Sequence, residues 1–379
     1  LDDIARKAGF DFASIDGEIY WDERAYYAFA LSEIETGLED PSNVLSDLCL
    51  ELVDRAVRDD RILERLELPQ HAWGLIADSW KRGDRSLYGR FDLAYDGAGP
   101  AKLLEYNADT PTALFEASVF QWSWLEDAMA RNTIPDTCDQ FNSIHEALVA
   151  EMKALASRVV MPTLHLACVA SSAEDRGLVS YLGECAKLAG FRTVELDIGQ
   201  IGSTGAGPFV DVEGKPIHLA FKLYPWEWMF RDDFIRSPSM QHTRFIEPAW
   251  KAILSNKGIL PLLWAMAPNH PNLLPAYFED DPMASRLGGS FARKPLHSRE
   301  GSNVSLVVAG RTMESTDGPY DRERAVLQAI AHMPSFDGNT PVVGSWIIAG
   351  KACGIGMRED TSLITKNSSR FVPHAIVDQ

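Results

Sequence analysis

The chain of 379 residues is 46% hydrophobic and 24% charged, the composition of a globular protein with a sizeable core. Its 36 Lys and Arg residues are outnumbered by 54 Asp and Glu residues, and the net charge of −18 argues against a partner with a phosphate backbone or an anionic membrane surface. The longest nearly uncharged apolar run, residues 258–268, is too short to span a bilayer.

Cysteine usage and the first residues indicate the compartment. The five cysteines lie far apart and form no CxxC pair, which predicts neither a disulfide framework nor a zinc site and is typical of a reducing cytosol. The opening LDDIARKAG lacks the pattern of a secretory signal. We therefore expect a soluble cytoplasmic protein without nucleic-acid or membrane partners, whose oligomeric state the sequence leaves open.

The N-terminal part of the chain predicts helices followed by a hairpin. Apolar residues at helical spacing predict helices over 24–66, interrupted by a turn and cap at residues 40–43 (DPSN). Residues 87–107 alternate with a period of two around a Gly-rich turn and predict a β-hairpin. Thr110 and Pro111 then predict a helix start, with the hydroxyl as N-cap and proline at the first helical position.

The rest of the chain predicts two further regions. Residues 162–197 read as strand, turn, helix and strand, a βαβ-like unit, followed by a Gly-rich loop and a strand over 218–224. From residue 251, short strands and Gly-rich turns predict a lobe built on antiparallel sheet. The three expected regions, packed against one another, are residues 1–150, 151–250 and 251–379.

The hairpin carries the most informative pattern of side chains. Arg90 and Asp92 face one side of the first strand, as Glu105 and Asn107 face one side of the second. With a constant register, Asp92 lies opposite Glu105 and Arg90 opposite Asn107, with Cβ atoms about 5 Å apart. Two carboxylates and an amide oxygen suit Mg²⁺, and Arg90 can hold a phosphate that the metal also touches. The alternative is a solvated polar face on which Arg90 only pairs with Asp92.

Two more segments combine charges with ligand-binding positions. Lys294 follows an apolar strand, and the turn at 299–303 (REGSN) can offer backbone N–H groups to phosphate oxygens, although an ordinary hairpin turn is the alternative. Glu174 and Asp175 begin a helix after a strand, where open α/β sheets place ligands and where two acids suit a cationic amine. The helix dipole alone also explains acids at this position.

Other motifs are absent or undecided. No P-loop, no G-x-G-x-x-G opening a helix, no HExxH and no G-x-S-x-G occurs, so a zinc hydrolase has no support. Lys257, taken alone, is an ordinary exposed lysine. The aromatic and charged run at 226–231 (WEWMFR) either lines a site or packs a lobe interface.

Together these segments resemble the glutathionylspermidine synthase family, whose synthetase domain is an ATP-grasp carbon–nitrogen ligase. The resemblance implies a mixed α/β ATP-grasp fold of the permuted, glutathione-synthetase-like type. Residues 151–250 would form its βαβ preATP-grasp lobe and residues 251–379 its ATP-binding lobe. The matching stretches, in the family's order, are YGRFDLAYDG…KLLEYNADTPTALFEAS (88–118), FIEPAWKAILSNKGILPLLW (245–264), FARKPLHSREGSNVSLV (291–307) and GIGMREDTSLI (354–364).

The same resemblance implies a catalytic centre at the hairpin. Asp92, Glu105 and Asn107 would bind Mg²⁺. Arg90 would hold the transferred phosphate and the acyl carboxylate, and Arg358 matches a family arginine near the reacting carboxylate. In the family the metal ligands precede the ATP-binding lysines, and the order in this sequence agrees.

Substrate contacts follow from the resemblance as well. Thr110 would touch the acid substrate, and Glu174 with Asp175 would bind the incoming amine. The implied ATP contacts are Lys257 and Lys294 at the phosphates, Glu300 and Gly301 in the covering loop, Gln328, Ala329, Ile330 and Ala331 at the adenine hinge, and Leu363 and Ile364 at the second adenine wall.

Departures from the family bring the resemblance closest to its shorter, stand-alone members, described as acid–amine ligases. Ala113 stands where some synthetases carry a cysteine, and Asp175 replaces a glutamate of the acidic pair. The amidase domain of the bifunctional members has no counterpart, so product hydrolysis is not expected.

We expect a ligase that uses ATP and Mg²⁺ to join a carboxylic acid, a glutathione-like peptide or another acid, to a polyamine-like amine through an acyl phosphate. The alternative is a non-catalytic nucleotide-binding protein that keeps the fold. A glycosidase with paired carboxylates ranks below both, because it leaves the lysines and the REGSN turn unexplained.

Overall fold

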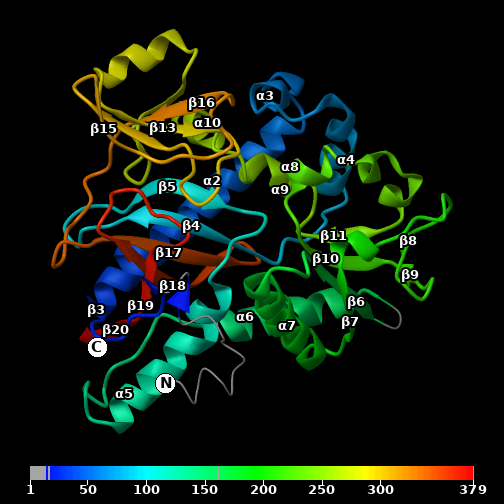
Figure 1. Cartoon of the computed structure of the whole chain (residues 1–379), viewed down its shortest axis with the longest axis horizontal. Coiled ribbons are helices and arrows are strands. Elements are labelled where there is room, and N and C mark those ends of the chain that lie inside the picture. The colour runs from blue at the N-terminus through cyan, green and yellow to red at the C-terminus, as the bar shows by residue number, and fades with distance from the viewer. Residues whose placement is uncertain (1–13, 16–17, 160–161, 379) are drawn as a thin grey trace.

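Three larger sheets organise the part of the chain that the computed structural model describes, residues 14–15, 18–159 and 162–378. Figure 1 shows a parallel sheet on one side of the molecule and two antiparallel sheets, one above the other, on the other side. One of the two antiparallel sheets combines strands from the N-terminal and C-terminal parts of the chain. This mixed α/β architecture agrees with the expected fold class.

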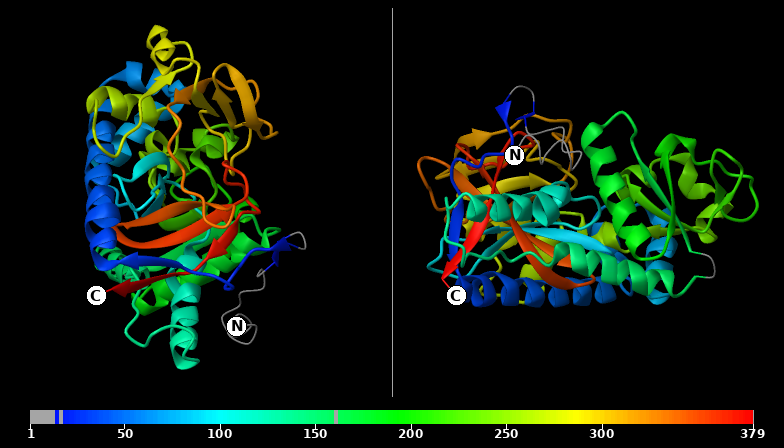
Figure 2. Two further views of the ribbon diagram at one scale, coloured as in Figure 1. Left: turned by 90° about the vertical axis from the view of Figure 1, so that its left-hand side faces the viewer. Right: turned by 90° about the horizontal axis from the view of Figure 1, so that it is seen from below.

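The central antiparallel sheet joins the predicted hairpin to the C-terminal part of the chain, in the order β19-β18-β17-β4-β5. Since β4 pairs with β17, the first and third expected regions share this sheet, and the division into three regions stays a prediction. The helix α2 lies along one face of the sheet (Figure 2). The bounds are β4 Tyr88–Ala94, β5 Lys102–Asn107, β17 Thr340–Ile348, β18 Lys351–Asp360, β19 Arg370–Val372 and α2 Asp40–Ala56.

The second antiparallel sheet has the order β12-β16-β13-β14-β15, and α10 packs on β12 and β16. It confirms the antiparallel sheet expected after residue 251. Lys294 lies within β13 rather than after it. The bounds are β12 Ala276–Phe278, β13 Phe291–Pro295, β14 Ser305–Val308, β15 Arg311–Ser315, β16 Ala325–Gln328, α9 Lys251–Leu254, α10 Ile259–Met266 and η6 Pro282–Leu287.

The parallel sheet has the order β11-β10-β6-β7 and contains the predicted βαβ unit, in which α7 connects β6 to β7. Ser172 caps α7 by accepting a hydrogen bond from the Asp175 N–H, and Glu174 and Asp175 lie in the first turn of the helix, as the sequence predicts. The bounds are β6 Thr163–Cys168, α7 Ala173–Leu188, β7 Arg192–Asp197, η3 Ile198–Gln200, β8 Phe209–Val210, β9 Pro216–Ile217, β10 Leu219–Leu223, α8 Trp226–Met229, η4 Asp233–Arg236, η5 Pro238–Gln241 and β11 Arg244–Ile246.

The predicted helical stretch 24–66 is wrong in two places. Residues Tyr27–Ala30 form β3, which pairs in parallel with β20 near the C-terminus. The DPSN segment does not interrupt the helix: the π-helix η1 runs directly into α2, and Pro41 is the second residue of α2. Remaining bounds are β1 Ser14–Ile15, β2 Glu18–Ile19, η1 Glu33–Glu39, α3 Asp60–Arg65, α4 Gln70–Lys81 and β20 His374–Asp378.

The helix predicted to start at Thr110 begins later than expected. The π-helical turn η2, Glu116–Phe120, leads into α5, Gln121–Ala130, and α6 spans Ile144–Ala156. Ala113 adopts a left-handed φ of 66°, so the helix cannot begin before this residue. The Thr112 carbonyl accepts a hydrogen bond from Arg90 Nη1 at 2.7 Å. This carbonyl therefore binds a side chain of the hairpin instead of a backbone N–H of a helix.

The hairpin register is confirmed where it matters for the predicted site. Arg90 pairs with Asn107 and Asp92 with Glu105. A bulge after Asp92 then shifts the register by one residue, so the constant register expected toward the turn is wrong there.

A buried ion pair joins the segment after β5 to the parallel sheet. Lys222 and Asp109 are almost fully buried, with Nζ 2.8 Å from Oδ1. The Asp109 Oδ2 atom accepts the backbone N–H of Trp226 at 2.8 Å, and Lys222 Nζ also donates to the Tyr224 carbonyl. Burial lowers the pKa of Lys222, which the charge of Asp109 opposes. The pair therefore fixes the segment that carries Thr110 against the neighbouring lobe.

Removing one partner of this pair is expected to destabilise the fold strongly. Asp109→Ala leaves the buried Lys222 ammonium without its counter-charge and the buried Trp226 N–H without its acceptor, and we expect the free energy of unfolding to fall by about 3–5 kcal/mol. Urea unfolding followed by tryptophan fluorescence measures the change. Asp127→Ala, which removes the exposed i,i+4 pair with Arg131, is the control and should cost about 0–1 kcal/mol. Equal unfolding midpoints for Asp109→Ala and the wild type would contradict this role.

Candidate functional site

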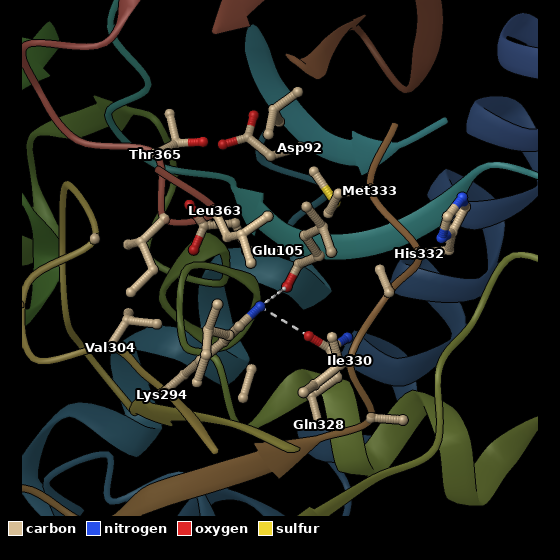
Figure 3. A pocket seen from close by; sticks show the side chains of 18 residues that line it. Asp92, Glu105, Lys294, Val304, Gln328, Ile330, His332, Met333, Leu363 and Thr365 are labelled. Carbon is tan, nitrogen blue, oxygen red and sulfur yellow. Dashed lines mark hydrogen bonds between the residues drawn. The ribbon is translucent and has the colours of Figure 1, made fainter. Parts of the chain in front are cut away.

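A cavity of about 330 Å³ opens between the central sheet and the second antiparallel sheet (Figure 3). Asp92 and Glu105 line it from the hairpin, and Lys294 lines it from β13. Most of the positions predicted to contact a nucleotide therefore lie around one space. The other predicted residues in its lining are Gly301, Gln328, Ala329, Ile330, Ala331, Leu363 and Ile364.

Part of this cavity has apolar walls. Ala292, Val304, Leu306 and Ile364 form a separate buried cluster at the cavity, and Ile330 faces the space as well. Apolar walls beside an extended backbone segment suit a flat heterocycle that also needs main-chain hydrogen bonds.

Lys294 is the buried cation of the cavity. Its ammonium donates to the Leu104 carbonyl and to Gln328 Oε1, each at 2.8 Å. Gln328 Nε2 in turn donates to the Leu103 carbonyl, so the amide is held on the edge of the hairpin. Burial lowers the pKa of Lys294 to about 8, although the charge of Glu105 raises it in part. A bound anion would stabilise the charged form of this buried ammonium.

Lys257 lies on the other side of Glu105. Its Nζ atom is 2.9 Å from Glu105 Oε2, and it also donates to the Ser298 carbonyl. Burial alone would raise the pKa of Glu105, but the charges of Lys257 and Lys294 outweigh it and lower the value to about 2. Glu105 is therefore ionised across the physiological range. No local sequence pattern indicates that Lys257 lies beside Glu105.

The hairpin presents an all-oxygen donor set. Asp92 and Glu105 are direct cross-strand partners, and Asn107 Nδ2 donates to both carboxylates, at 2.9 and 3.0 Å. Turning the amide by half a turn would present its oxygen to the same point, so the set fits a hard divalent cation. No group of three or more His, Cys, Asp or Glu side chains in the described ranges is placed to hold a metal. The candidate set is thus two carboxylates and one amide.

Arg90 is held in a fixed orientation beside this set. Its Nε and Nη2 atoms bind the two oxygens of Asp92 at 2.6 and 3.0 Å, and its guanidinium carbon lies 5.6 Å from the Trp346 ring centroid. The pairing with Asp92 that we considered as the alternative is therefore present. Burial raises the pKa of Asp92, which the charge of Arg90 opposes.

The REGSN turn closes over the cavity from β13. Gly301 has a left-handed φ of 71°, and a Cβ atom added there would collide with the Thr365 carbonyl oxygen, so this position requires glycine. Arg299, in the same turn, does not line the cavity: it donates to Thr110 Oγ1 at 2.7 Å and to Glu227 Oε1 at 3.3 Å. Neighbouring residues of one turn thus contact both the cavity and Thr110. The Glu300 side chain is exposed.

Arg358 and the acidic pair lie outside the lining of this cavity. Arg358 donates to the carbonyls of Ser369, Lys366 and Asn367. Glu174 and Asp175 lie in the first turn of α7, on the parallel-sheet side.

Charges link these residues to the rest of the site. Burial, followed by the charges of Glu116 and Asp175, raises the pKa of Glu174 to about 7, and the charge of Arg358 acts in the opposite direction. The acidic pair is therefore within electrostatic range of the arginine.

Sequence reasoning missed several residues that the structure places at the site. Arg299 contacts Thr110 directly, and Glu227 contacts Arg299. Glu116 is buried close to Arg90 and Arg358. The aromatic and charged run at 226–231 indicated either a site or a lobe interface, and the sequence did not distinguish between them. Glu116 carried no signal, because a lone glutamate at the start of a helical pattern usually serves the helix dipole.

Comparisons with known proteins define the family. Residues 1–377 match the family described as glutathionylspermidine synthase preATP-grasp, so the chain belongs to this family. A "Putative acid–amine ligase" of Haemophilus influenzae is 40% identical over 381 residues, covering 97% of this chain and 95% of the relative. The bifunctional glutathionylspermidine synthetase/amidase of Escherichia coli is 27% identical over 395 residues, covering 97% of this chain and 62% of the relative.

The fold has a counterpart among solved structures. A glutathione synthetase-like effector of Globodera pallida superposes with a TM-score of 0.58 at 12% identity, over 96% of this chain and 92% of the other. The fold is thus an ATP-grasp fold of the glutathione-synthetase-like type, as expected. No helix in the described ranges is both long and apolar enough to cross a membrane.

Proposed function

We propose that this protein is an ATP- and Mg²⁺-dependent ligase that joins a carboxylic acid to an amine through an acyl phosphate. One observation carries the proposal: the cross-strand carboxylates Asp92 and Glu105 line one cavity with an apolar wall together with the ammonium group of Lys294, and Arg90 and Lys257 form ion pairs with these two carboxylates. The family and the acid–amine ligase name of a 40% identical relative support it.

The cavity suits a nucleotide triphosphate. The apolar wall and residues 328–331 would hold adenine, and Lys257 and Lys294 would bind phosphate oxygens under the REGSN turn. Asp92, Glu105 and Asn107 would hold Mg²⁺, which, when bound, neutralises charge on the phosphates.

Arg90 would position the acid for phosphorylation. A carboxylate oxygen of the acid attacks the terminal phosphorus, the bond to the ADP oxygen breaks, and an acyl phosphate forms. Arg90, fixed by Asp92 and the Thr112 carbonyl, has a rigid guanidinium that can stabilise the charge developing on the transferred group. The amine then attacks the acyl carbon and phosphate leaves. Phosphorylation is needed because an unmodified carboxylate has no adequate leaving group.

The acid and amine would enter from the parallel-sheet side. Thr110 with Arg299 is suited to an acidic or peptide-like substrate, whereas Glu174 and Asp175 would attract a cationic, polyamine-like amine. These assignments fit a soluble enzyme of the cytoplasm, where ATP and both substrate classes occur.

Phosphate release tests the proposal against a nucleotide-binding protein without ligase activity. The purified protein is incubated with ATP, Mg²⁺ and a panel of acids, including glutathione, each paired with amines such as spermidine. We expect phosphate release with at least one pair, together with a product whose mass is acid plus amine minus water. Release at background for every pair, in a protein that binds ATP, would favour the non-catalytic alternative. Arg90→Ala is the matched control and should lower turnover by about 10²–10³.

The acidic pair predicts a pH dependence of amine binding. Glu174 has a raised pKa of about 7, so its carboxyl is neutral below pH 7 and negatively charged above it. The KM for spermidine should therefore fall by up to about tenfold between pH 6 and pH 8 as the carboxylate forms. Glu174→Gln should remove this change, whereas Glu184→Gln, on the exposed face of the same helix, should keep it. A pH dependence of KM that survives in Glu174→Gln would exclude Glu174 as its source.

A further inference from the structure

Glu116 is a buried carboxylate that the proposed mechanism does not yet use. It lies on η2 and is only 2% exposed. The hydroxyl of Tyr20 donates to its Oε1 atom at 2.7 Å. Within residues 18–159 and 162–378, no lysine, arginine or histidine lies within ion-pair distance of this carboxylate. A buried carboxylate with a neutral partner is costly, and such groups concentrate where a function needs them.

Residues beside Glu116 contact two arginines of the proposed site. Thr112, four residues earlier, accepts a hydrogen bond from Arg90 through its carbonyl. The guanidinium carbon of Arg358 lies 5.7 Å from the ring centroid of Tyr20, whose hydroxyl donates to Glu116. The charge of Glu116 also raises the pKa of Glu174 at the start of α7.

The titratable groups around Glu116 come from four parts of the chain: the neutral Tyr20 from the N-terminal segment, Arg90 from β4, Arg358 from β18 and Glu174 from α7. Burial raises the pKa of Glu116, while the Tyr20 hydroxyl and the two arginines oppose the rise. Such a carboxylate is more basic than an exposed one, yet it stays near the positive charge that would hold an acyl phosphate.

We propose that Glu116 is the catalytic base that takes a proton from the ammonium group of the incoming amine. This assignment rests on the proposed ligase function. A protonated amine has no free electron pair, so R–NH₃⁺ must first transfer one proton to the Glu116 carboxylate. The neutral R–NH₂ then forms the N–C bond to the acyl carbon, the C–O bond to phosphate breaks, and the second proton leaves nitrogen with the phosphate as HPO₄²⁻. Glu116 finally releases its proton to water.

Hydroxylamine separates this role from a structural one. Hydroxylamine is mostly uncharged at neutral pH and attacks acyl phosphates without first losing a proton to a base. The assay measures coupling of spermidine and formation of iron-binding hydroxamate side by side, with ATP, Mg²⁺ and the same acid panel that includes glutathione. Glu116→Gln keeps the shape of the side chain and the contact with Tyr20 but removes the base.

We expect Glu116→Gln to lower kcat for spermidine by about 10² or more while hydroxamate formation stays at the wild-type rate. Glu116→Asp should retain part of the spermidine activity, and Glu126→Gln, an exposed position on the following helix, should retain all of it. Equal loss of both reactions in Glu116→Gln, or unchanged coupling of spermidine, would overturn the assignment. If the wild type forms no hydroxamate with any acid, the proposed function itself fails, and the assignment of Glu116 with it.

Discussion

The pairing of Asp92 with Glu105 across β4 and β5 is the constraint on which the rest of the site depends. Two carboxylates directly opposite each other repel, so the fold must supply positive charge around them. Arg90 supplies it on one side, and Lys257 and Lys294 supply it on the other, from segments more than 150 residues away in the chain. A loss of this register would leave buried charges of both signs uncompensated.

The same hairpin also connects the two halves of the proposed reaction. The backbone after β5 is fixed to the parallel sheet by the Asp109–Lys222 pair, and Thr110 beside it meets Arg299 from the REGSN turn. The parallel sheet and the cavity between the antiparallel sheets are therefore joined by a few polar contacts. In the proposed reaction, these contacts would hold the parts of the chain that bind acid, nucleotide and amine in one arrangement.

The sequence predicted the hairpin face because side-chain alternation alone fixes which residues point to one side of a strand. It could not predict the late helix start after Thr110, since that start depends on the left-handed Ala113 and on a carbonyl taken by Arg90. The strand Tyr27–Ala30 was not predicted for a similar reason: its partner β20 lies at the other end of the chain. The approach of Lys257 to Glu105 entered only through the family resemblance, and Glu116 had no local pattern at all.

A crystal structure with Mn²⁺ and a non-hydrolysable ATP analogue tests the central claim most directly. Anomalous scattering from manganese identifies the metal without reference to the protein model. The account predicts a manganese peak between the carboxylates of Asp92 and Glu105, with the triphosphate within reach of Lys257 and Lys294. Nucleotide bound elsewhere, or a manganese position away from both carboxylates, would contradict it.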